Sequence, residues 1–184
     1  MLKKLSLLIA AAMLIPSYSF AATQGTTGAT STGTVDISIN VGEIARISNL
    51  SDFNLGNWVA GTVTDQQNVC IYTNESLGQY TVTASSLNSQ GGNFSLYDGG
   101  SNYLEYRVYW EDQAGGSVGT STASWFGAGS SGTTSGAQSN ANTTSDTCGG
   151  IDNATLLVRV LNADLTAAVD GAYSDTLTLI IAPN

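Results

Sequence analysis

The sequence predicts an all-β domain, and three observations lead to this prediction. Ser, Thr, Gly and Asn are abundant, whereas charged residues make up only 10% of the 184 residues, a composition that favours short strands with polar outer faces over helices. Several runs rich in β-branched and aromatic residues alternate with polar residues at a period of two. Turn residues separate these runs at short intervals, as they do between the strands of a sheet.

The first 21 residues have the pattern of a secretory signal peptide. Lys3 and Lys4 precede an apolar segment over 5–15, and small residues end the stretch at Ala21. We therefore expect an exported chain that begins near Ala22, with three arginines against fourteen acidic residues and a net charge of 3 − 14 = −11. This charge repels nucleic acid and anionic lipid, and no later apolar run is long enough to predict membrane insertion.

The chain contains two cysteines, Cys70 and Cys148. In an exported protein oxidation is expected, so the sequence predicts one disulfide between them. With no histidine and only two cysteines, too few ligands remain for a zinc site. We expect neither a metal nor a cofactor.

Eight to ten short strands are predicted, the pattern of an immunoglobulin-like β-sandwich. The clearest candidates cover residues 34–41, 43–50, 67–74, 78–86, 93–98, 102–112, 154–162 and 173–183. Residues 59–65 are predicted to form a turn and residues 127–150 a long polar surface loop. One weak helical turn is predicted within residues 162–171. In the run over 102–112, Leu104, Tyr106, Val108 and Trp110 share the face expected to pack.

The strand predicted over 34–41 has an unusual setting. Val35, Ile37, Ile39 and Val41 share one face, but a Thr- and Gly-rich leader precedes them and Gly42 follows. Two interpretations fit this pattern: the strand is the first of a complete sandwich, or it pairs with another domain.

The residue types argue against an enzyme. The chain has no histidine, and after the predicted signal peptide it has no lysine, so its many Ser and Thr hydroxyls lack a base that could activate them. Glu111 and Asp112 are neighbours on a predicted strand and point to opposite faces, unlike the facing carboxylates of a glycosidase.

Three stretches resemble subunits of chaperone-usher pili, close to the archaic, spore-coat-U-like branch. They are "GTVDISINVGEIARISNL" near the N-terminus, the central pair "NVCIYTNESLGQYTVTAS" and "YRVYW", and the ending "GAYSDTLTLIIAPN". Such subunits lack the last strand of their own sandwich and accept the N-terminal strand of the next subunit. The resemblance therefore implies an incomplete immunoglobulin-like sandwich, which a donated strand completes by β-augmentation.

The resemblance also assigns residues and boundaries. It implies a signal peptide over 1–21, an N-terminal extension with the donor strand over 22–41 and a pilin domain over 42–184. The donor row is Gly33, Val35, Ile37, Ile39 and Val41. The C-terminal strand that borders the acceptor groove carries Gly171, Tyr173, Leu177, Leu179 and Ile181.

The implied function is that of a structural subunit of an extracellular fimbria, supporting surface adhesion or biofilm formation. Its implied partners are identical subunits, a periplasmic chaperone and an outer-membrane usher, with export through the periplasm to the cell surface. The sequence departs from the family in two places. Pro183 stands where the family usually has a penultimate aromatic residue, and the first strand has no cysteine.

A second class of function is a secreted carbohydrate-binding sandwich or a fibre-tip adhesin. Trp58, Trp110 and Trp125, together with eight tyrosines, are residue types that stack on sugar rings. In a sandwich the same aromatic residues also fill the core.

Overall fold

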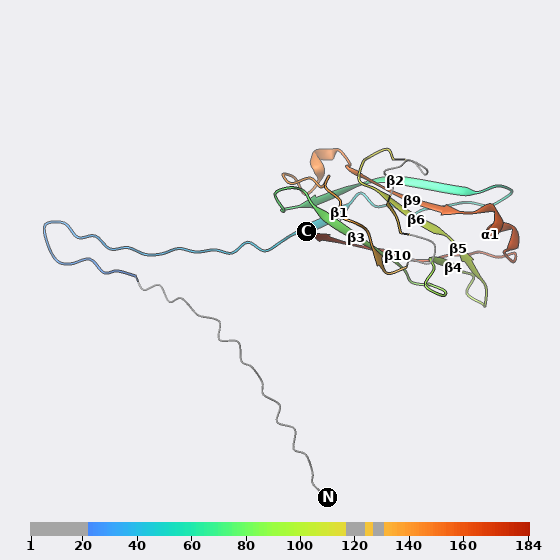
Figure 1. Ribbon diagram of the computed structural model, residues 1–184, viewed down its shortest axis with the longest axis horizontal. Helices are drawn as coiled ribbons and strands as arrows, with labels where there is room; N and C mark the ends of the chain where they lie inside the picture. The colour runs from blue at the N-terminus through green and yellow to red at the C-terminus, as the bar shows by residue number, and fades with distance from the viewer. Residues whose placement is uncertain (1–21, 117–123, 127–130) are drawn as a thin grey trace, which may run out of the picture. The chain divides into compact units, whose positions relative to one another are not determined.

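The computed structural model describes residues 22–116, 124–126 and 131–184 (Figure 1). The chain divides into two compact units, one ending at Val41 and the other covering Gly42–Asn184, and each is described by itself. The predicted signal peptide, residues 1–21, lies outside the described residues.

Residues 22–41 contain one isolated β-bridge, between Thr23 and Thr34, with a backbone hydrogen bond of 3.0 Å in each direction. The strand predicted over 34–41 has no ladder partner among the described residues. Its alternating pattern supplies one apolar row, but an isolated strand has no neighbouring edge with which to form backbone hydrogen bonds.

A five-stranded sheet forms one layer of the larger unit, with its strands in the order β1-β2-β9-β6-β7 and all neighbours antiparallel. The strands are β1 (Ala45–Ser48), β2 (Val63–Thr73), β6 (Arg107–Glu111), β7 (Ser124–Trp125) and β9 (Ala154–Val160).

A three-stranded antiparallel sheet, in the order β10-β3-β8, forms the second layer, and a two-stranded sheet pairs β4 with β5 (Figure 1). These strands are β3 (Tyr80–Ser86), β4 (Ser95–Tyr97), β5 (Tyr103–Glu105), β8 (Thr133–Thr134) and β10 (Leu177–Pro183). The 3-10 turn η1 (Cys148–Gly150) and the short helix α1 (Asn162–Ala167) are the helical elements of the described residues.

The core lies between the two layers. Val82 of β3 and Val108 of β6 are fully buried within it, and the rings of Tyr80 and Trp110 meet edge to face with centroids 6.4 Å apart. The indole N–H of Trp110 donates to the Tyr80 hydroxyl at 3.2 Å. The predicted all-β fold is therefore confirmed, with two sheets packed face to face as in an immunoglobulin-like sandwich.

Three local predictions were wrong. The run over 102–112 divides into β5 and β6, because the chain changes partner at Tyr106, whose N–H bonds to Phe94. β2 starts at Val63, inside the predicted turn, because its polar first half pairs with β9. The segment over 127–150 is not simply a surface loop, since β8 pairs with β3 and Gln138 is buried.

Two predictions on faces and helices were right. Leu104, Tyr106, Val108 and Trp110 are all buried, as their alternation predicted. The weak helical turn expected within 162–171 is α1.

Candidate strand-acceptor site and donor segment

The C-terminal strand β10 is an edge strand whose inward side chains are only partly covered. It pairs with β3 from Leu177 opposite Ser86 to Pro183 opposite Tyr80. Its inward row of Leu177, Leu179 and Ile181 packs against the core, yet none of the three is fully buried. The inward residues of β3, which has neighbours on both sides, are fully buried.

The first strand β1 is the corresponding edge of the other sheet. Ile47 of β1, and Phe53 and Leu55 beyond it, pack against the core but stay partly exposed. β1 and β10 are also in contact with each other. Since each ends its sheet among the described residues, a partly covered side of the core lies beside two strand edges that have unpaired backbone groups.

A partly buried hydrogen-bond cluster around Asp175 holds the segment immediately before β10 in place. The Asp175 carboxylate accepts from the hydroxyls of Ser86 and Tyr106, each at 2.6 Å, and from the N–H of Asn88 at 2.9 Å. Burial, reinforced by this carboxylate, raises the pKa of Tyr106 well above its usual value. The cluster joins β10 to both layers, so the position of the edge is fixed by the core.

A second buried tyrosine has a similar partner. The Tyr80 hydroxyl donates to the Asp112 carboxylate at 2.6 Å, and Asp112 also accepts from the N–H of Ser139 at 2.7 Å. Burial is the largest cause of the raised pKa of Tyr80, and the hydrogen bond to Asp112 is the second. The pair ties the segment that follows β8 to the core.

The remaining predicted residues of the acceptor site lie just before β10. Tyr173 packs partly against the core, and its hydroxyl donates to the carbonyl of Val169 at 2.9 Å. Gly171 is exposed, and a Cβ there would meet only ordinary contacts with Tyr173 and Asp98. Neither residue is part of the β10 ladder, so the predicted strand over 173–183 is too long at its start.

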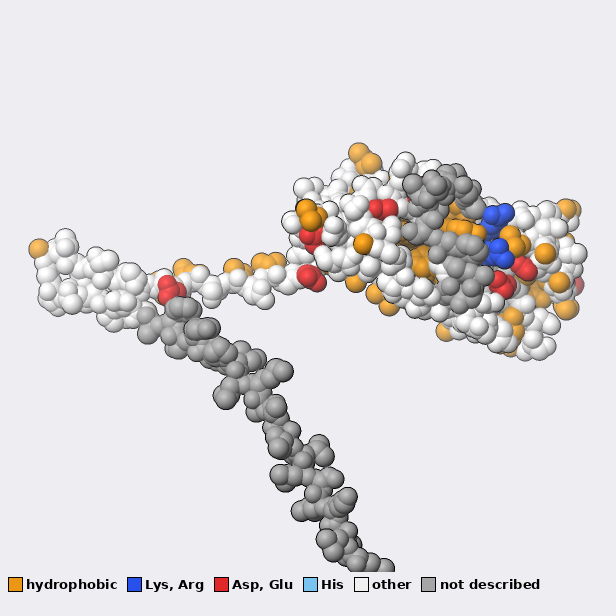
Figure 2. All heavy atoms as spheres, viewed as in Figure 1, with side chains coloured by type: hydrophobic (Ala, Val, Ile, Leu, Met, Phe, Trp, Pro, Cys, Tyr) orange, Lys and Arg blue, Asp and Glu red, His pale blue; other side chains and the backbone are white. Residues whose placement is uncertain are grey.

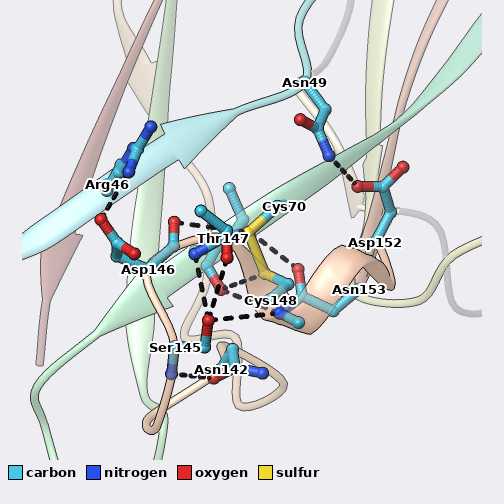
Figure 3. The surroundings of a disulfide bond; sticks show 12 residues. Arg46, Asn49, Cys70, Asn142, Ser145, Asp146, Thr147, Cys148, Asp152 and Asn153 are labelled. Atoms are coloured by element: carbon cyan, nitrogen blue, oxygen red, sulfur yellow. Dashed lines mark hydrogen bonds and ion pairs between the residues drawn. A yellow bond between two sulfur atoms is a disulfide. The ribbon is translucent and has the colours of Figure 1, made fainter.

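The disulfide between Cys70 and Cys148 is present, as predicted (Figure 3). Cys70 lies in β2 and Cys148 begins η1, and both are buried. Figure 3 also shows an ion pair between Arg46 of β1 and Asp146 beside this bond. The disulfide thus fastens the segment before β9 to the sheet in which β1 is the edge.

The predicted donor row lies in the other unit. Val35, Ile37, Ile39 and Val41 are 71%, 90%, 88% and 69% exposed. Gly33 is exposed too and precedes the Thr23–Thr34 bridge. Four exposed β-branched apolar side chains in alternate positions form a row that burial would stabilise.

Charge is unevenly distributed on the visible face. In Figure 2 the visible Arg side chains lie together at one place, whereas Asp and Glu side chains are scattered. Val35, Ile37, Ile39 and Val41 carry no charge, so the donor row differs from the acidic character of the chain.

Sequence reasoning missed some residues of the site. Asn74, immediately after β2, accepts from the N–H of Ile44 and donates to the carbonyl of Gly42, at 2.7 and 2.8 Å. No periodic pattern marks such a residue. Phe53 and Leu55 alternate with polar residues, but the segment forms no strand.

The two described tryptophans that were considered for sugar binding differ in exposure. Trp110 is fully buried and Trp58 is 38% exposed. The side chain of Trp125 lies outside the described residues. Tyr97 and Tyr103 stack with centroids 4.9 Å apart, as a cross-strand pair of the β4–β5 hairpin.

The described residues contain no cluster of three or more His, Cys, Asp or Glu side chains that could hold a metal ion. No helix of the described residues is long and apolar enough to cross a membrane.

No protein-family model matches the chain, and no curated protein does. Among similar solved structures is a chain described with a chaperone–tip adhesin complex in CFA/I fimbriae biogenesis, with a TM-score of 0.46 and 18% identity. Another belongs to the CsuC–CsuE chaperone–tip adhesion subunit pre-assembly complex from archaic chaperone-usher Csu pili of Acinetobacter baumannii, with a TM-score of 0.44 and 16% identity. Each alignment covers 76% of this chain but only 41% and 39% of the other chains. Likenesses of this size decide nothing about function, which has to be argued from the residues of this chain.

Proposed function

We propose that the chain is a structural subunit of an extracellular fimbria and polymerises by donor-strand exchange. The observation that carries the proposal is an apolar row, Val35 to Val41, that is exposed in a chain whose sandwich has a partly covered core beside two open strand edges. The two features are complementary, since the apolar row has no sheet to pair with and the open edge of the sandwich has room for a further strand.

The acceptor is the side of the sandwich where β1 and β10 end their sheets. Leu177, Leu179 and Ile181 offer a partly buried apolar row there, and the free backbone edge of β10 offers hydrogen-bond donors and acceptors. A strand added beside β10 removes both the exposed apolar surface and the unpaired backbone groups.

The donor is the segment over 33–41 of a neighbouring copy. Burying a valine or isoleucine side chain contributes about 1.5 to 3 kcal/mol, so the four residues of the row contribute roughly 6 to 12 kcal/mol. Ordering the segment and the loss of free motion on association oppose this sum. Backbone hydrogen bonds along the new ladder offset part of that cost.

The competing interpretation is a complete sandwich whose first strand is residues 34–41. That interpretation expects these residues to pair within their own sheet and to bury their apolar row. The 69–90% exposure of the row favours donation to another copy.

The partners follow from this mode of assembly. Until a strand is donated, the open edges need a temporary cover, and a periplasmic chaperone fits that need, with an outer-membrane usher for secretion. The finished fibre at the cell surface would support adhesion or biofilm formation. Pro183 is the last residue of β10, paired opposite Tyr80, so chaperone contact at this position has to use features other than an aromatic side chain.

The test is electron microscopy of the mature chain, residues 22–184, purified from its native export route. Fibres are expected. A variant that lacks residues 22–41 should form no fibres and should need a chaperone or an added donor peptide for solubility. A variant that carries residues 22–41 after Asn184, through a short linker, should be a soluble monomer. A stable wild-type monomer with residues 34–41 paired in its own sheet would overturn the proposal.

A further inference from the structure

Asn74 forms three hydrogen bonds with the backbone immediately before β1. Its side-chain oxygen accepts from the N–H of Ile44 at 2.7 Å, and its side-chain nitrogen donates to the carbonyl of Gly42 at 2.8 Å. Its own backbone N–H donates to the carbonyl of Ile44 at 3.1 Å. The last bond continues the β1–β2 ladder, in which Ala45 opposes Thr73.

The positions of these bonds indicate an extended backbone over residues 42–44. In an extended chain the carbonyl of one residue and the N–H of the residue two positions later face the same side, and the carboxamide of Asn74 spans these two groups. Gly42 accordingly lacks the positive φ that many other glycines of the chain have. The carboxamide thus extends the β1–β2 pairing by two further hydrogen bonds.

Gly42 is the residue at which the chain would otherwise turn back. It is the only glycine between Gly33 and Gly56. A tight hairpin that placed residues 34–41 against the free edge of β1 needs a positive φ at its turn. With residues 34–41 as the strand of such a hairpin, the turn consists of residues 42–44, and Gly42 is the only one of these three without a Cβ.

We propose that Asn74 is a positioning residue that prevents the chain from closing its own sheet with residues 34–41 and so keeps this segment available to another copy. The inference rests on the proposed function, because it concerns which sheet the donor segment enters. Holding Gly42 extended removes the turn, and the segment is then directed to a neighbour.

The chain contains a matched control for this arrangement. Gln67 of β2 holds Ser51, beyond the other end of β1, with the same chemistry. Its side-chain oxygen accepts from the N–H of Ser51 at 2.7 Å, and its side-chain nitrogen donates to the carbonyl of Ser51 at 2.9 Å. Removing this carboxamide weakens the attachment of the same chain segment without releasing Gly42.

The experiment compares oxidised mature chains, residues 22–184, that carry Asn74→Ala, Gln67→Ala, Gly42→Val or both Asn74→Ala and Gly42→Val. After refolding, size-exclusion chromatography gives the ratio of monomer to polymer. Hydrogen exchange of the monomer pool then reports whether the amides of residues 34–41 are protected. Valine at position 42 favours an extended backbone, and its Cβ meets no atom within 4 Å.

Asn74→Ala should raise the fraction of monomers with protected 34–41 amides about tenfold, the size of change expected from losing one or two hydrogen bonds. Adding Gly42→Val should return this fraction to the wild-type level, although the lost hydrogen bonds are not restored. Gln67→Ala should leave it unchanged. Asn74→Asp keeps the acceptor for Ile44 but loses the donor to Gly42, so it should give an intermediate value and serves if Asn74→Ala does not fold.

Equal protection of residues 34–41 in the Asn74→Ala and Gln67→Ala monomers would refute the role of Asn74. Protection in the wild-type monomer would refute it as well, since the segment would then already be closed. If no variant polymerises, and Asn74→Ala still increases the protection, the proposed fimbrial function fails while the role of Asn74 stands.

Discussion

Ile37→Asp tests the donor row at its most exposed member. Ile37 is 90% exposed, so nearly all of its side chain is available for burial in a joint between copies. Losing that burial removes about 2 to 3 kcal/mol. Placing a carboxylate in the same apolar surroundings adds a penalty of several kcal/mol, even when the group takes up a proton. The joint should therefore weaken by at least about 5 kcal/mol, or more than a thousandfold in dissociation constant.

Ser38→Asp is the matched control, because residue 38 lies next in the chain but faces the other side of the strand. It adds the same charge without removing an apolar side chain from the row. Light scattering coupled to size-exclusion chromatography, over a range of protein concentrations, measures polymer formation by both variants. We expect polymers with Ser38→Asp and monomers with Ile37→Asp. Equal polymerisation of the two variants would refute the assignment of the row.

Three further predictions concern stability. Thiol labelling should find no free thiol before reduction, and reducing the Cys70–Cys148 disulfide, whose sequence separation is 78, should lower the free energy of unfolding by about 4.5 kcal/mol in the chain-entropy model; labelling without reductant would contradict this. Burial raises the pKa of Tyr80 and Tyr106 above the usual tyrosine value of about 10, so both stay neutral in the folded chain while the same residues ionise in the unfolded chain. Stability should be constant from neutral pH to about 10 and then fall by roughly 1.4 kcal/mol per pH unit for each tyrosine, and a flat urea-denaturation profile up to pH 11.5 would show the reasoning to be wrong. Gly78→Ala should destabilise the fold by about 1 to 3 kcal/mol, because Gly78 has φ +66° and a Cβ would lie 2.7 Å from the carbonyl oxygen of Ala141; an unchanged melting temperature would argue against that packing.

The sequence by itself was sufficient for features that depend on local periodicity or on composition. The alternation of Leu104, Tyr106, Val108 and Trp110 predicted their buried face, because adjacent side chains of a strand point to opposite sides. Two cysteines in a chain with a predicted export signal indicated the disulfide, which is present. Leu177, Leu179 and Ile181, which occupy alternate positions in the sequence, likewise share the inward face of β10.

Which strands pair with one another, and where each strand begins, depends on the tertiary structure. Whether the run over 102–112 forms one strand or two depends on β4 and β9, which lie far apart in sequence, and their ladders place a break at Tyr106. β2 begins four residues earlier than predicted because β9 supplies hydrogen-bond partners to its polar first half. Backbone hydrogen bonds between strands stabilise polar and apolar segments alike, so the polarity of a segment does not show where its strand begins.

The roles of the polar residues at the candidate site also depend on the tertiary structure. Asn74 and Asp175 are single polar residues in a chain rich in such residues, and neither belongs to a repeating pattern. Their importance comes from the backbone and hydroxyl groups that the fold brings to them: Gly42 and Ile44 for Asn74, and Tyr106 for Asp175. Hydrophobic periodicity is a local pattern and can be recognised in the sequence. A hydrogen bond between residues 30 or 69 positions apart forms only when the sheets have assembled, so no local pattern predicts it.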